Sequence, residues 1–154
     1  MSLTARRTFF QGFFKNWSRK SIYPPSSDLI TTNNRLYPYY FSSHNDLQDI
    51  INIKQSLLLH FTVQADPQYN KSTELLFDIL ASKDKYPLDS YKYPVHLANI
   101  SCDSFESKDL MLTYGVNKLP TLVRLHKQIP VDIYSPGKEF NEDELLDWLK
   151  KIEE

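Results

Sequence analysis

YGVNKLPTL, residues 114–122, is the most informative segment of this 154-residue sequence. Gly115 follows a short helical stretch, residues 107–114, and supplies the left-handed conformation in which helices commonly end. Pro120 comes directly before residues 121–126, an apolar run typical of a strand. The segment therefore predicts a helix, a tight connection and a strand in immediate succession.

Strand and helix patterns alternate through the rest of residues 36–154. Strands are expected over residues 36–41, 56–63, 95–102, 121–126 and 130–134, with Pro38 suited to an edge strand. Helices are expected after a cap at residues 43–46, over residues 72–82 and 107–114, and after a capping box formed by Asn141 and Glu144. Strands linked by helices pair in parallel, and the last two strands form a hairpin. The order predicts an α/β fold with a mixed central sheet and helices on both faces.

This order, together with two local signatures, resembles the thioredoxin fold. Residues 114–122 are similar to the pattern Y-G-[IV]-x-x-[IVFL]-P-T-L of that family. SLLLHFTVQADPQYNKSTELL, residues 56–76, is similar to its strand, active-site turn and helix. NISCD, residues 99–103, resembles the end of its third strand, and Gly137 falls where the family has a glycine before its last helix. The resemblance implies a thioredoxin-like domain over residues 36–154 and a cis Leu119–Pro120 bond.

One departure from the family pattern decides which chemistry is possible. The CxxC motif of the family aligns with residues 66–69, Asp-Pro-Gln-Tyr, and Cys102 is the single cysteine of the chain. Disulfide exchange needs one thiolate to attack and a second thiol to resolve the mixed disulfide. The sequence therefore excludes dithiol oxidoreductase activity.

With that chemistry excluded, we expect a protein partner to bind at the surface that thioredoxins use for substrates. The residues expected there are Asp66, Pro67, Gln68, Tyr69, Leu119 and Pro120. The resemblance implies that a partner peptide pairs with the backbone of Leu119 as an added strand. The alternative is that Pro120 only shapes the turn. Arg124, a charge inside an apolar strand, is either paired or solvent-reaching, or it contacts the partner or a ligand.

Three further features have two interpretations each. Cys102 is either a buried apolar filler or a reactive thiol, which would need exposure and a positive neighbour. His60, near Asp66 and Tyr69 in the resemblance, is either a buried histidine with ordinary partners or a proton-linked switch. The tyrosine-rich stretch KDKYPLDSYKY, residues 83–93, is either a plain surface loop or an interface.

The composition argues against metal and cofactor sites. The four histidines, His44, His60, His96 and His126, have no metal-ligand spacing. Three glycines are too few for a glycine-rich phosphate loop. No apolar run approaches the ~18 residues that span a bilayer. We therefore expect no metal, no cofactor and no stable membrane span.

Residues 1–27 differ in charge from the rest of the chain. They carry five basic residues and no acid, whereas the other residues carry 13 basic and 19 acidic side chains, a net charge of -6. A basic, acid-free N-terminus with several aromatic residues is typical of a mitochondrial transit peptide, and RTFFQG, residues 7–12, resembles a matrix-processing pattern. The alternative is a basic tail for nucleic acid or anionic lipid; the acidic body disfavours nucleic acid. Residues 28–35 are expected to be a linker.

Three functions are open at this point. The leading hypothesis is a redox-inactive, thioredoxin-like protein of the mitochondrial matrix that binds or assembles protein partners. The second is a single-thiol or glutathione-linked oxidoreductase or transferase that uses Cys102. The third is a structural subunit of a large mitochondrial complex.

Overall fold

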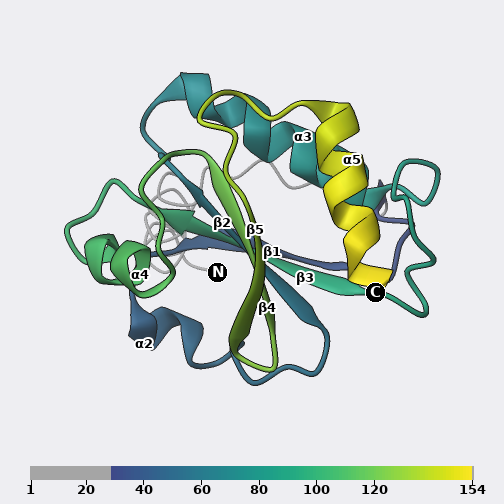
Figure 1. Ribbon diagram of the computed structural model, residues 1–154, viewed down its shortest axis with the longest axis horizontal. Coiled ribbons are helices and arrows are strands. Elements are labelled where there is room, and N and C mark those ends of the chain that lie inside the picture. The colour runs from purple at the N-terminus through teal and green to yellow at the C-terminus, as the bar shows by residue number, and fades with distance from the viewer. Residues whose placement is uncertain (1–28, 154) are drawn as a thin grey trace, which may run out of the picture.

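The computed structural model describes residues 29–153, so the expected transit peptide over residues 1–27 lies outside the described part. The strands are β1 (Arg35–Phe41), β2 (Ser56–Thr62), β3 (Val95–Ser101), β4 (Thr121–His126) and β5 (Ile129–Tyr134). The α-helices are α2 (His44–Leu47), α3 (Asn70–Ala81), α4 (Ser107–Thr113) and α5 (Glu142–Lys150). Two 3-10 turns, η2 (Pro67–Tyr69) and η3 (Lys151–Glu153), complete the order (Figure 1).

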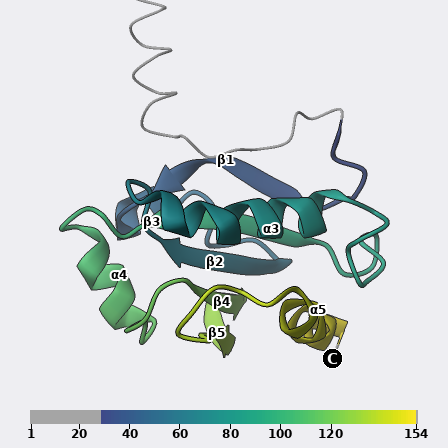
Figure 2. The same cartoon turned by 90° about the horizontal axis from the view of Figure 1, so that it is seen from above.

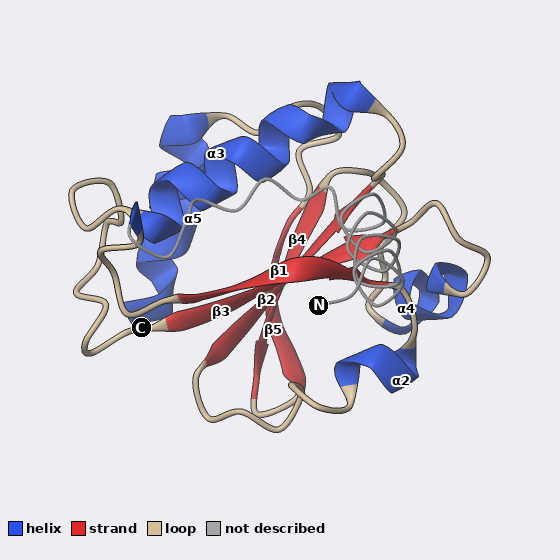
Figure 3. Cartoon of the chain, turned by 180° about the vertical axis from the view of Figure 1, so that it is seen from behind, coloured by secondary structure: helices blue, strands red, loops and turns tan. Residues whose placement is uncertain are grey.

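The strands form one mixed five-stranded sheet in the order β1-β3-β2-β4-β5. β3 pairs in parallel with both β1 and β2, while β4 is antiparallel to β2 and to β5. Figure 3 shows the strands fanning across one another, as the natural twist of a sheet requires. Pro38 lies in β1 at the sheet edge, where its missing N–H costs no ladder bond. The expected mixed α/β sheet is confirmed.

Helices cover both faces of this sheet, with α3 and α5 on one face and α2 and α4 on the other (Figures 1 and 2). Each face has its own core. Leu58 of β2 packs in the core with Leu76 of α3 and Trp148 of α5. Its neighbours Leu57 and Leu59 point to the opposite core, since successive side chains of a strand alternate between faces. β2 is therefore buried along its whole length.

The structure confirms the predicted capping residues of two helices and changes the detail of each. Ser43 and Asp46 form the expected capping box, but α2 ends at Leu47, and the chain continues in turns that still bury Ile50. Asn141 caps α5 by accepting the N–H of Glu144 at 3.0 Å. The box predicted there is wrong, because the Glu144 carboxylate accepts a hydrogen bond from the Tyr134 hydroxyl instead.

The stretch expected to be a linker, residues 28–35, is packed on the domain from Thr31 onward. The Thr31 N–H donates to the carbonyl of Ala81 at the end of α3, and the Thr32 hydroxyl donates to that of Leu80. Asn34, 6% exposed, donates to Leu80 and accepts the N–H of Val95, the first residue of β3. These bonds satisfy helix-end carbonyls that have no partner inside the helix.

The outer strand β5 combines apolar exposure with few free donors. Ile129, Val131 and Ile133 are 62%, 49% and 44% exposed. Pro130 has no N–H, and the N–H of Ile133 donates to the side chain of Asp132 at 2.8 Å. The β4–β5 register also shifts in this part of the hairpin.

Replacing Asn34 tests whether this stretch belongs to the folded domain. We expect Asn34→Ala to lower the free energy of unfolding by about 1–3 kcal/mol, because it leaves the buried Val95 N–H without a partner and removes one of the two hydrogen bonds to the Leu80 carbonyl. The matched control is Asn33→Ala, which removes an exposed side chain and keeps the backbone bond to Ser90. Urea unfolding measures both; equal stabilities of the two variants would contradict this account.

Candidate partner-binding groove

The turn at residues 66–69 is fixed by its own aspartate. Asp66 caps η2 by accepting the Gln68 N–H at 3.1 Å, and its second oxygen accepts the Gln68 amide at 3.0 Å. Pro67 supplies the first residue of the 3-10 turn, where its fixed φ suits a helical start. Asp66 therefore shapes the turn that carries two cysteines in the family pattern.

A second carboxylate, which the sequence analysis did not single out, holds the loop before this turn. Asp103 accepts the N–H of Gln64 and the N–H of Ala65, each at 2.7 Å, and the Ser101 hydroxyl at 3.3 Å. Charge-assisted bonds of this length are among the strongest that a carboxylate makes. Asp103 thus joins the end of β3 to the approach of the η2 turn. Its only signal in the sequence is its place in NISCD, directly after a strand.

A groove of about 520 Å³ lies between the start of α3, the loop before β4 and the loop before α5. We name it the Leu119 groove. Its apolar lining comes from Tyr69, Leu75, Leu119, Pro120 and Phe140, and its charged rim from Lys71, Lys138 and Glu139. The Leu119–Pro120 bond is cis, as expected. Of the predicted partner residues, Gln68, Tyr69, Leu119 and Pro120 line this groove, while Asp66 and Pro67 lie in the adjoining turn.

The rim of the groove is rich in ammonium groups. Lys71 pairs with Glu139 at 3.6 Å, but both side chains are so exposed that the pair adds little stability. Lys118 lays its stem along Gly137, whose φ of +75° favours glycine; a Cβ there would lie 3.5 Å from the Lys118 side chain. That distance is an ordinary van der Waals contact, so the positive φ of the turn, and not Lys118, is what favours glycine at position 137.

Arg124 does not belong to this groove. It lies at the other end of β4, where its Nε donates to the Ser56 hydroxyl at 3.1 Å. A separate pocket there is lined by Arg124, Ser56 and residues 91–94 of the loop that the sequence marked as tyrosine-rich. The structure thus separates Arg124 from the other six predicted partner residues.

His60 lies buried beneath the Leu119 groove. Its Nδ1 is 2.7 Å from the Asn99 side-chain oxygen and its Nε2 is 3.1 Å from the Ser72 hydroxyl. The same hydroxyl donates to the Tyr69 carbonyl at 2.9 Å, which links the buried histidine to the groove wall. Burial lowers the pKa of His60 to about 4, although the Asn99 hydrogen bond opposes this shift. His60 is therefore neutral near pH 7, with Asn99 and Ser72 as its partners, and Asp66 is bonded elsewhere.

Cys102 lies on the opposite face of the sheet from His60. It packs at the border of the core that contains Phe61 and Leu110. Burial, with a smaller contribution from the nearby Asp103, raises the pKa of the Cys102 thiol to about 12, while a backbone hydrogen bond involving Thr62 opposes the shift. The thiol is protonated at neutral pH and faces away from the groove.

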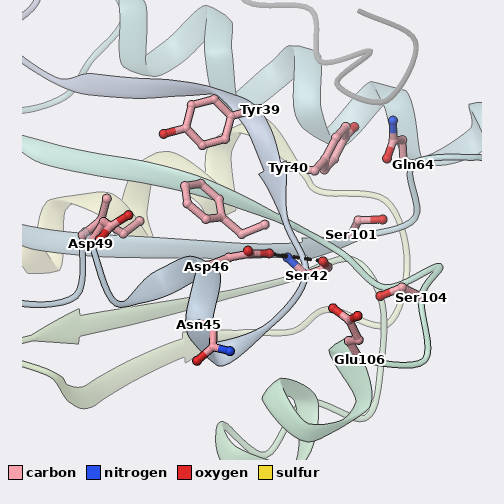
Figure 4. Close-up of a pocket in the computed structure, with 12 residues that line it drawn as sticks. Tyr39, Tyr40, Ser42, Asn45, Asp46, Asp49, Gln64, Ser101, Ser104 and Glu106 are labelled. Carbon is pink, nitrogen blue, oxygen red and sulfur yellow. Dashed lines mark hydrogen bonds between the residues drawn. The ribbon is translucent and has the colours of Figure 1, made fainter. Parts of the chain in front are cut away.

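A larger cavity of about 600 Å³ opens at the carboxyl end of β1. Figure 4 shows Asp46, Asp49 and Glu106 around it, with Asp46 bonded to Ser42. Asp46 accepts the Ser42 N–H at 2.8 Å and is committed to capping α2. Within residues 29–153, no group of three or more metal-ligating side chains is arranged to hold a metal ion.

The architecture has clear counterparts among solved structures. The chain is similar to a thioredoxin from Fasciola hepatica, with a TM-score of 0.55 and 18% identity over 76% of this chain and 97% of that one. A mutant thioredoxin from Halobacterium salinarum gives 0.55 and 20% over 80% and 96%. A thioredoxin from Nicotiana alata gives 0.56 and 19% over 77% and 92%. The chain has a thioredoxin-like fold.

At this level of identity the likeness establishes the thioredoxin-like fold alone. No protein-family model and no curated protein matches the sequence. None of the helices in residues 29–153 is both long enough and apolar enough to cross a membrane.

The buried His60 predicts a specific pH dependence. The folded state keeps His60 neutral down to pH about 4, whereas the unfolded chain protonates it below the ordinary value of 6.5. The unfolded state therefore takes up this proton first, and stability contributed by His60 is lost as the pH falls from 6.5 towards 4. Between pH 7 and pH 5 we expect a loss of about 2 kcal/mol, measured by urea unfolding.

His60→Gln should flatten that part of the pH dependence, since an amide does not titrate. The matched control is His126→Gln, the same change at an exposed position, which should keep the wild-type pH dependence. A His60→Gln curve parallel to that of the wild type would show that His60 is not the titrating group.

Proposed function

We propose that this protein is a redox-inactive, thioredoxin-like binding module that holds a partner segment in the Leu119 groove. The observation that carries this proposal is the pairing of a retained groove with a turn that has no thiol. Asp66 caps that turn, and Tyr69, Leu119 and Phe140 line the groove beside it. The fold supplies the groove, and the residues at the turn can support binding but not sulfur exchange.

The backbone of Leu119 is available for an added strand. Within residues 29–153 no hydrogen bond engages Leu119, which stands two residues before Thr121, where β4 begins to pair with β2. An extended partner segment can pair with this backbone and place an apolar side chain between Tyr69 and Phe140. Main-chain bonds would supply affinity and the apolar walls would supply selectivity.

The proposal includes residence in the mitochondrial matrix. It rests on the basic, acid-free residues 1–27 and on their contrast with a body of net charge -6. A matrix protein of this kind acts either as a free adaptor or as a subunit of a large assembly. Sedimentation of the tagged protein from mitochondrial lysate separates the two, since only a subunit migrates with a large particle.

Cys102 tests the competing thiol-based function. At pH 8, we expect iodoacetamide to alkylate the native thiol at least about 100-fold more slowly than in denatured protein, because a pKa of about 12 leaves very little thiolate. The loss of free thiol is followed by mass spectrometry. Native and denatured rates within tenfold of each other would favour the enzyme that uses Cys102.

The groove itself is tested by Leu119→Asp in the full-length chain. Partner recovery from isolated mitochondria should fall by about tenfold or more, because a carboxylate would be buried in an apolar contact. Leu112→Asp is the matched control, since Leu112 lies on α4 and is 80% exposed outside the groove. Quantitative mass spectrometry compares the captured proteins.

Thermal unfolding of the same variant checks that the fold survives. Tyr69→Ala is a second groove variant at a half-buried position and should lose the same partners. Unchanged partners in both groove variants would remove the groove from the proposed function.

A further inference from the structure

A second pocket, of about 350 Å³, lies at the opposite end of the sheet from the Leu119 groove. It forms where β2 and β3 begin and β4 ends, and we name it the Arg124 pocket. Basic side chains from three separate segments line it, namely Lys54, Lys92, Arg124 and His126. No carboxylate is among its lining residues within the described part of the chain. This gathering of basic residues is unexpected on a body whose net charge is -6.

Within residues 29–153, Arg124 is held in place by a hydrogen bond and not by a salt bridge. Its Nε donates to Ser56, a residue only 6% exposed, which fixes the orientation of the guanidinium plane. Asp132 lies opposite on β5 and its charge acts on Arg124, but its ion pair is with Lys151 at 3.8 Å, and no ion pair to Arg124 occurs in residues 29–153. Burial of the guanidinium lowers the pKa of Arg124 in spite of Asp132, and a bound anion would offset that cost of burial.

The loop that contributes Lys92 is ordered by its own hydrogen bonds. The carbonyl of Asp89 accepts the N–H of Lys92 at 3.1 Å and the N–H of Tyr93 at 2.8 Å. The buried Tyr86 donates its hydroxyl to the Tyr93 carbonyl at 2.8 Å. This bonding fixes the loop backbone and leaves Tyr91, 84% exposed, at the mouth of the pocket.

We propose that the Arg124 pocket binds a phosphate group carried by a small ligand. A planar guanidinium with a fixed orientation presents paired N–H donors that match the oxygens of a phosphate. Lys54 and Lys92 add mobile positive charges from either side, and the volume suits a compact phosphate ester. Tyr91 offers an aromatic face to a ring attached to that phosphate. This site is independent of the Leu119 groove and of the function proposed for it.

The test is a titration of the full-length protein with inorganic phosphate and with adenosine monophosphate at constant ionic strength. Binding is followed by calorimetry and by amide chemical shifts. We expect saturable binding with shifts at residues 54–56, 91–93 and 124–126. Lys54→Gln combined with Lys92→Gln should weaken binding by tenfold or more. The matched control is Lys83→Gln combined with Lys85→Gln, two exposed lysines that do not line the pocket, and should change the affinity less than twofold.

Each outcome decides the proposal. Saturable binding of either probe, lost with Lys54 and Lys92 but not with the control pair, supports it, and tighter binding of the nucleotide assigns the aromatic contact to Tyr91. Equal losses in both double variants reveal only general charge attraction and overturn the pocket. Absence of binding to both probes, including the case in which phosphatidic acid vesicles alone bind, also overturns it.

Discussion

Burial of β2 on both faces is the constraint on which the rest of the structure depends. Every residue of this strand is buried, and it pairs with β3 on one side and with β4 on the other. Alternate side chains of β2 enter two different cores, so the helices on the two faces of the sheet pack against opposite sides of this one strand. The η2 turn leaves the end of β2 and the Arg124 pocket borders its start, so one strand positions both sites.

The polar residues near the groove hold its walls in place through hydrogen bonds. His60 lies between Asn99 and Ser72, and Ser72 joins it to the carbonyl of Tyr69. Asp66 closes its own turn, and Asp103 anchors the preceding loop. These bonds order the residues beneath and beside the groove, and none of them exposes a nucleophile. A rigid wall of this kind favours recognition, because less order must be gained when a partner binds.

Local patterns in the sequence predicted the parts of the fold that local forces decide. The five strands, the Asn141 cap and the cis Leu119–Pro120 bond follow from neighbouring residues or from a short motif. The Asp103 clamp spans 39 residues and the Asn34 bridge to β3 spans 61, so neither leaves a periodic signal. Arg124 was grouped with the predicted partner-binding residues. Its position along β4 instead places it beside Ser56, at the other end of the sheet from the groove. Gln68, Tyr69, Leu119 and Pro120 line one groove because they lie in the two segments that carry the resemblance; their role in partner binding stays a prediction.

The outer strand β5 has a consequence for how this molecule behaves at high concentration. Its exposed isoleucines and valine would invite stacking of sheets from neighbouring molecules. A strand arriving from outside would meet a proline without a donor and an isoleucine whose donor the adjacent aspartate already occupies. The apolar edge strand β5 can therefore pack its side chains against other surfaces. It resists the addition of further strands that would build a continuous, amyloid-like sheet.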